Sequence, residues 1–168
     1  MNQTENKKKE LEKIINLLNV KKYDAVVSKA KILVKKFPND YIFYNALGMA
    51  LMNLGQFDES LKILNKAIKL DDKNIHVLNN LGLAHSSIAN YQIANEYYNR
   101  ALKIKPDFLN ALINLANLKE NFNLNTDAIE VLKIALKHYP DDYFLHYTIG
   151  TIYQFLGDFE KSHFHYQK

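Results

Sequence analysis

Apolar residues recur along this chain at the spacing of helix faces, in pairs of stretches separated by short polar breaks. Leu47, Leu51 and Leu54 fall on one helical face of a first stretch, and Leu61 and Leu64 fall on one face of a second stretch. Both stretches are long enough for amphipathic helices and neither alternates with the period of two that a strand requires. The pattern therefore predicts an all-α chain built from helical hairpins.

The hairpins repeat every 34 residues. Four sets of like residues share this period: Gly48, Gly82 and Gly150 with Ala116 in the remaining slot; the aromatics Tyr23, Phe57, Tyr91 and Phe159; Ala67, Ala101 and Ala135; and Pro38, Pro106 and Pro140 with Asp72 as the exception. Agreement of independent columns at one period predicts a repeat architecture. We expect units at 7–40, 41–74, 75–108 and 109–142, a partial unit at 143–168, and a disordered or frayed stretch at 1–6.

Turn and cap residues fit the same division. Gly55 and Gly157 lie where a hairpin must turn at positive φ, and Asn123 takes that place in the fourth unit. Small residues such as Gly48 are expected to let the two helices of one hairpin approach closely. Acidic residues near helix starts are expected to cap them, namely Asp58, Asp158 and the pairs Asp71 with Asp72 and Asp141 with Asp142.

The motif resembles the tetratricopeptide repeat. In the segment NALGMALMNLGQFDESLKILNKAI the matching residues are Leu47, Gly48, Leu51, Gly55, Phe57 and Ala67, and the resemblance extends over residues 7–168. It implies a right-handed superhelical solenoid whose first helices line a concave groove. Ile14 departs from the motif in the first unit, and Lys119 and Asn125 depart from it in the fourth. We expect these two units to pack less regularly.

The resemblance places a peptide-binding surface on the first helices. The candidate residues are mostly amides and carry almost no charge: Asn45, Met49, His76, Asn79, Asn80, Asn110, Asn114, Asn117, Tyr147 and Thr148. Amides both donate and accept hydrogen bonds, which suits an extended peptide backbone.

Asn80 and Asn114 share one repeat position that resembles the asparagine ladder of O-linked N-acetylglucosamine transferase. Ala46 and Thr148 fill the other two slots, so the ladder is incomplete. The chain contains twenty asparagines, and a coding bias that scatters asparagine everywhere remains the alternative.

The amino-acid composition limits which kinds of catalytic site, metal site and partner are expected. The absence of cysteine excludes disulfides and thiolate zinc sites, and the six histidines show no metal-binding spacing. No nucleophile, phosphate loop or paired-acid motif appears, so we expect no enzymatic activity, no metal and no cofactor. Residues 1–40 hold ten lysines against five acids and the chain has a single arginine, which disfavours nucleic-acid binding. No stretch is long and apolar enough to span a bilayer, and we expect no membrane partner and a cytoplasmic location.

Three functions are compatible with this sequence. The first is a scaffold that binds a peptide or protein segment in the concave groove. The second is an amino-terminal substrate-recognition module of a larger enzyme, such as a glycosyltransferase or sulfotransferase. The third is a structural repeat protein that self-associates through an exposed C-terminal end, where Phe155, Phe159, Phe164 and Tyr166 are expected to lie.

Overall fold

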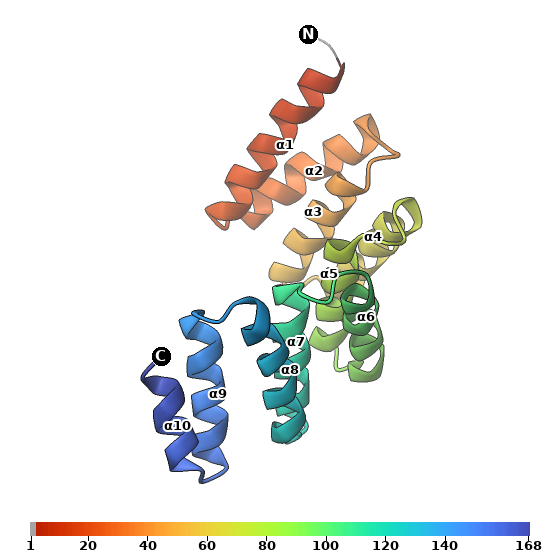
Figure 1. Cartoon of the computed structure of the whole chain (residues 1–168). Helices are drawn as coiled ribbons and strands as arrows, with labels where there is room; N and C mark the ends of the chain where they lie inside the picture. The colour runs from red at the N-terminus through yellow and green to blue at the C-terminus, as the bar shows by residue number, and fades with distance from the viewer. Residues whose placement is uncertain (1–2) are drawn as a thin grey trace. The chain divides into compact units, whose positions relative to one another are not determined.

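The computed structural model describes residues 3–168, which form ten α-helices and no strand (Figure 1). The helices are α1 Gln3–Asn19, α2 Tyr23–Lys36, α3 Tyr41–Asn53, α4 Phe57–Leu70, α5 Ile75–Ser87, α6 Tyr91–Ile104, α7 Leu109–Asn121, α8 Asn125–His138, α9 Tyr143–Phe155 and α10 Phe159–Tyr166. The all-α prediction is confirmed. Helix α1 begins inside the stretch expected to be frayed, so residues 3–6 are helical. Residues 1 and 2 lie outside the described part.

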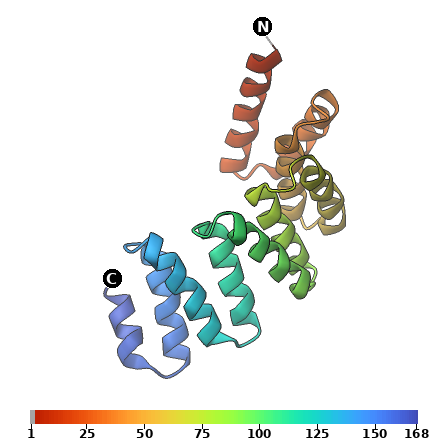
Figure 2. The same ribbon diagram turned by 45° about the vertical axis from the view of Figure 1, so that its right-hand side comes forward.

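The chain forms two compact units, one ending at Ala94 and the other beginning at Asn95. In the first unit α1 packs against α2 and α3 packs against α4, and α5 lies against both α3 and α4. In the second unit α7 pairs with α8 and α9 pairs with α10, and α8 also packs against α9. Figure 2 shows α9 and α10 running side by side. Each of the two compact units therefore contains helical hairpins.

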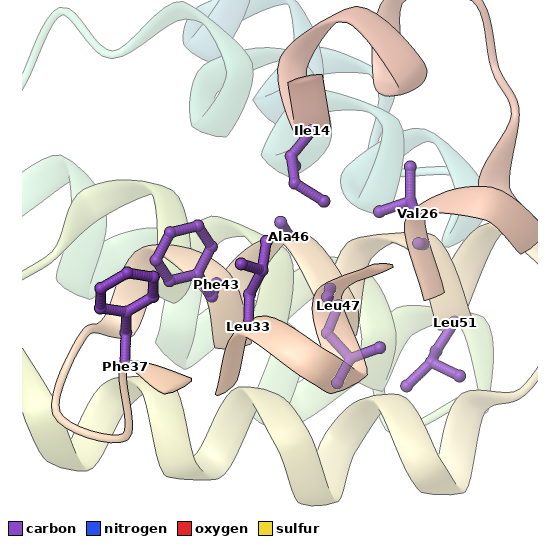
Figure 3. Packing of buried hydrophobic residues seen from close by; sticks show 10 residues of the cluster. Ile14, Val26, Leu33, Phe37, Phe43, Ala46, Leu47 and Leu51 are labelled. Carbon is purple, nitrogen blue, oxygen red and sulfur yellow. The ribbon is translucent and has the colours of Figure 1, made fainter. Parts of the chain in front are cut away.

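The core of the first unit joins its first three helices. Phe37 and Phe43 stack with ring centroids 5.3 Å apart, and Figure 3 shows the two rings beside each other near Leu33. Ile14, which replaces the small residue of the motif, is fully buried in the same cluster. The larger side chain is thus accommodated as core in this hairpin.

The core of the second unit follows the same pattern. Leu112 and Ala116 from α7 are buried with Leu132 from α8 and with Leu145 and Ile149 from α9. The small residue Ala116 occupies the repeat position at which three other repeats have glycine, and it is completely buried.

The five hairpin turns within residues 3–168 use one backbone conformation. The residues with φ between 53° and 79° are Lys21, Gly55, Ala89, Asn123 and Gly157, and they fall 34 residues apart. In each turn the following backbone N–H donates to a carbonyl five residues earlier at 2.9–3.0 Å, as from Gln56 to Leu51. The prediction of positive φ at Gly55, Gly157 and Asn123 is confirmed. Lys21 and Ala89 also have positive φ, although neither lysine nor alanine is a residue type that favours this conformation.

Replacing Ala89 by glycine should stabilise the protein. The left-handed conformation costs an L-residue about 1–2 kcal/mol, while glycine loses about 0.5–1 kcal/mol more backbone entropy on folding. We therefore expect a gain of about 0.5–1 kcal/mol in the free energy of unfolding, measured by urea denaturation. Gly55→Ala is the matched control and should lose a similar amount, because a Cβ there meets nothing within 4 Å and only its φ of +74° opposes it. Equal stability of Ala89→Gly and the wild type would contradict this account.

Three first helices, α3, α5 and α9, are capped by side chains from one repeat position, whereas Phe108 before α7 gives no side-chain cap. Asp40 accepts from the Ile42 N–H, and Asp142 accepts from the Phe144 and Leu145 N–H groups. In the third 34-residue repeat the cap is Asn74, which accepts from the N–H groups of His76 and Val77. The prediction that Asp71 and Asp72 cap this helix was wrong: Asp71 instead accepts a 3.0 Å bond from the Asn74 amide and ends α4.

Candidate peptide-binding surface

The candidate residues of the first unit lie on α3 and α5 with unequal exposure. Asn45 and Met49 on α3 are half-buried and His76 on α5 is exposed. Asn79 and Asn80 are only 6% and 8% exposed. Little of either side chain is therefore accessible on this surface, less than expected for groove residues.

Asn80 is held by its neighbour helix. Its amide nitrogen donates to the Asn45 amide oxygen at 2.8 Å, which links α5 to α3. A buried amide needs such a partner, because leaving it unsatisfied is costly. The pair is therefore a contact between α3 and α5, and the amide hydrogen that Asn80 donates to Asn45 is not available to a bound peptide.

The candidates of α7 are more accessible. Asn110 and Asn117 are exposed and Asn114 is half-buried. They lie on the side of α7 that is turned away from buried Leu112 and Ala116.

On α9 the surface becomes aromatic. Tyr147 is exposed and its ring lies 5.8 Å from that of Tyr166 on α10, whose hydroxyl donates to the Gln154 side chain at 2.9 Å. The hydroxyl of Thr148 is half-buried and donates to the Phe144 carbonyl within the same helix at 2.8 Å. Among the α9 candidates, Tyr147 therefore presents the largest accessible side chain.

A small hollow of about 190 Å³ opens beside the α7–α8 turn and the end of α9. Its lining combines one carboxylate, two amides, a hydroxyl and two apolar side chains, from Glu120, Asn123, Asn125, Thr151, Ile152 and Phe155. Asn125 had been noted only as a break in the aromatic column, which is the signal that points to this hollow.

A buried histidine pair lies between α9 and α10. The Nδ1 atoms of His146 and His165 are 2.9 Å apart, and the His146 Nε2 is 2.9 Å from the Pro140 carbonyl. A carbonyl only accepts, so the neutral His146 carries its proton on Nε2 and accepts from His165 through Nδ1. Sequence reasoning missed this pair, since residues 19 apart on two helices show no periodic signal.

Acid should weaken the last hairpin through this pair. Burial first, and then the nearby His146 and Lys133, lower the pKa of His165 from its usual value of 6.5. The unfolded chain then takes up a proton below pH 6.5 that the folded chain resists, so stability falls as the pH drops from 6.5 toward the lowered pKa. We expect urea denaturation to show lower stability at pH 5.5 than at pH 7.5. The decline should be shallower in His165→Val, which has the residue type of Val131 at the same repeat position, and unchanged in the exposed His163→Gln.

The described residues contain no group of three or more histidine, cysteine, aspartate or glutamate side chains placed to hold a metal ion. Over residues 3–168, no helix combines the length and the apolar character required to cross a bilayer.

Comparison with known protein families identifies the type of repeat. Two tetratricopeptide repeat models match the chain, one over residues 41–107 and the other over residues 79–143, so together they span more than half of it. No curated protein sequence matches the chain.

Solved structures share the fold at low sequence identity. TTC0263, a thermophilic TPR protein of Thermus thermophilus, is 15% identical with a TM-score of 0.82, and the match covers 95% of this chain and 88% of that one. MamA of Desulfovibrio magneticus RS-1 is 18% identical with a TM-score of 0.77, covering 95% and 90% of the two chains. The recurring sequence motif, the helical hairpins and these matches agree: the chain belongs to the tetratricopeptide repeat family.

Proposed function

We propose that this protein is an interaction scaffold that binds a peptide or protein segment along the first helices of its hairpins, in the concave groove of the predicted solenoid. The tetratricopeptide fold is typical of non-enzymatic scaffolds that bind proteins. Specificity within such a fold depends on the side chains that the packing leaves outside the core.

The observation that carries the proposal is the surface of α7 and α9. Asn110, Asn117 and Tyr147 are exposed there and none of them is charged. Amides pair with peptide N–H and C=O groups, and a rigid tyrosine supplies contact area at low entropic cost. The same interpretation extends to Met49 and His76 on the first helices of the other unit.

The test is binding by a double variant. Peptides captured from an array by the wild-type protein should bind the Asn117→Ala, Tyr147→Ala protein at least tenfold more weakly, since truncating a central tyrosine typically costs about 2 kcal/mol or more. Asn99→Ala is the matched control, because Asn99 is exposed on a second helix and its amide bonds only to the Asn95 carbonyl. Full affinity in the double variant, with its helical content intact, would refute the proposed surface. Asn80 is unsuitable for this test because its removal disturbs the Asn45 pair.

Self-association is a second candidate, and one observation favours it. The four aromatic residues expected at the C-terminal end are all exposed, namely Phe155, Phe159, Phe164 and Tyr166. Phe164 stands where the other units have Ser28, Lys62, Glu96 and Glu130, every one of them exposed and polar. The repeat itself therefore gives no reason for an apolar residue at this position.

The variant Phe164→Glu tests this candidate with little disturbance of the core, because Phe164 is exposed and Glu130 occupies the equivalent position; the variant loses the edge-to-face contact with His165. If self-association uses this end, the mass measured by light scattering should rise with concentration in the wild type and stay monomeric in Phe164→Glu. A wild-type protein that remains monomeric at high concentration would eliminate the candidate.

A further inference from the structure

We propose that the hollow beside Asn125 binds the ammonium group of a lysine side chain, and that this lysine belongs to the bound peptide. The second part rests on the proposed scaffold function, because Glu120 and Thr151 of the hollow lie on the first helices α7 and α9.

The hollow arises from two departures from the repeat. Asn125 stands where Tyr23, Phe57 and Phe159 supply an aromatic ring in other units, and the missing ring leaves space. Phe155 is the reverse case, since the equivalent residues of other units, such as Asn53, are polar. Both departures line the same hollow of about 190 Å³. Local rules that are broken without a packing reason are characteristic of functional sites.

The Asn125 side chain is suited to receive a donor. It is only 9% exposed, and within residues 3–168 it makes no hydrogen bond. Its side-chain amide is open to the hollow, where its oxygen can accept a hydrogen bond from a ligand. Asn125 lines the hollow together with three other polar residues, Glu120, Asn123 and Thr151.

The remaining polar groups favour a cation. Glu120 contributes a carboxylate, and the Thr151 hydroxyl already donates its proton to the Thr148 carbonyl at 2.7 Å, which leaves its oxygen to accept. Helices α7 and α9 both end at the hollow, and the partial negative charge of helix C-termini attracts cations. Helix α8 begins there and opposes this with one partial positive charge, which the full charge of Glu120 exceeds.

Lysine fits this lining better than other side chains. Its ammonium is a compact charge with three donors that rotate to meet separate acceptors, whereas the arginine fork requires coplanar ones. Glu120, Asn125 and Thr151 offer three separate acceptors. The aliphatic stem of lysine packs on apolar surface, which the exposed Phe155 side chain supplies, and an aromatic ring also attracts a cation over its face.

The experiment is an NMR titration with Nα-acetyl-lysine amide, which carries the side chain without a peptide. We expect saturable shifts of the Asn125 side-chain amide and the Thr151 methyl group. Nα-acetyl-norleucine amide, which lacks the charge, should give none. Glu120→Gln should raise the dissociation constant about tenfold or more, since an ion pair becomes a neutral contact. Glu130→Gln removes an exposed charge from the same unit and should change nothing.

A filling variant separates the site from the fold. Asn125→Phe restores the aromatic column and should abolish the lysine response while raising the unfolding temperature. Shifts of equal size with norleucine, full affinity in Glu120→Gln, or a stronger response to Nα-acetyl-arginine amide would overturn the assignment. Since the probe is not a peptide, its failure leaves the scaffold proposal intact, and loss of peptide binding in the Asn117 and Tyr147 variant leaves the hollow intact.

Discussion

Replacing Phe43 by alanine is expected to lower the free energy of unfolding by about 3–5 kcal/mol, the usual range for a buried phenylalanine. The Phe43 side chain is completely buried and stacks on Phe37 with a centroid distance of 5.3 Å. Its removal leaves a cavity in the core cluster that joins α1, α2 and α3. The loss is measured by urea denaturation followed by circular dichroism.

Phe155→Ala removes the same atoms from the other end of the chain and is the matched control. The Phe155 side chain is 75% exposed, so its truncation should change stability by less than about 0.5 kcal/mol. Similar losses in the two variants would contradict the division into core and surface.

Gly48→Ala should destabilise the protein by about 1–3 kcal/mol, although alanine is the better helix former. A Cβ at this position would lie 2.5 Å from Cγ and 2.6 Å from Cδ2 of Leu64. Leu64 is fully buried on α4, so making room for the Cβ requires either α3 and α4 to separate or Leu64 to displace its core neighbours. The Ser60 hydroxyl, which donates to the Gly48 carbonyl at 2.7 Å, depends on the same close approach. Thermal or urea denaturation measures the effect.

Gly150→Ala provides the comparison. There the added Cβ would lie 2.7 Å from Cε1 of Tyr166, but Tyr166 is exposed in the last helix and its ring can swing away. We expect a much smaller loss, close to zero. In a Leu64→Ala background the penalty of Gly48→Ala should also shrink, because the clashing atoms are gone. A penalty that is independent of Leu64 would show that another contact is responsible.

The helical hairpins could be predicted because their causes are local. Apolar residues at helical spacing and glycines at turns act within one repeat, and the same signals recur in successive repeats every 34 residues. The positive φ of Lys21 and Ala89 could not be read from residue type. The hydrogen bond that closes each turn, such as the one from Asn90 to His85, imposes the conformation whatever side chain is present.

The candidate site was less predictable, because it depends on pairs that are distant in sequence. Asn80 has the repeat position of a groove residue, but its amide meets Asn45, 35 residues earlier, and is buried by it. His146 and His165 belong to different helices and meet through their Nδ1 atoms. Periodicity predicts which face of a helix a residue occupies, but it does not predict which residue of another helix packs against that face.

The caps and turns also determine how the length of such a chain can change. Asp40 and Asn74 cap successive first helices from equivalent positions, and Gly55 and Ala89 close successive hairpins. Excising residues 41–74 would join Asp40 directly to Ile75 and leave the new junction with a capping carboxylate already in place. Gene duplication or loss can therefore add or remove whole modules cleanly, whereas a single-residue deletion inside a helix rotates every later side chain by about 100° and turns its apolar stripe out of the interior.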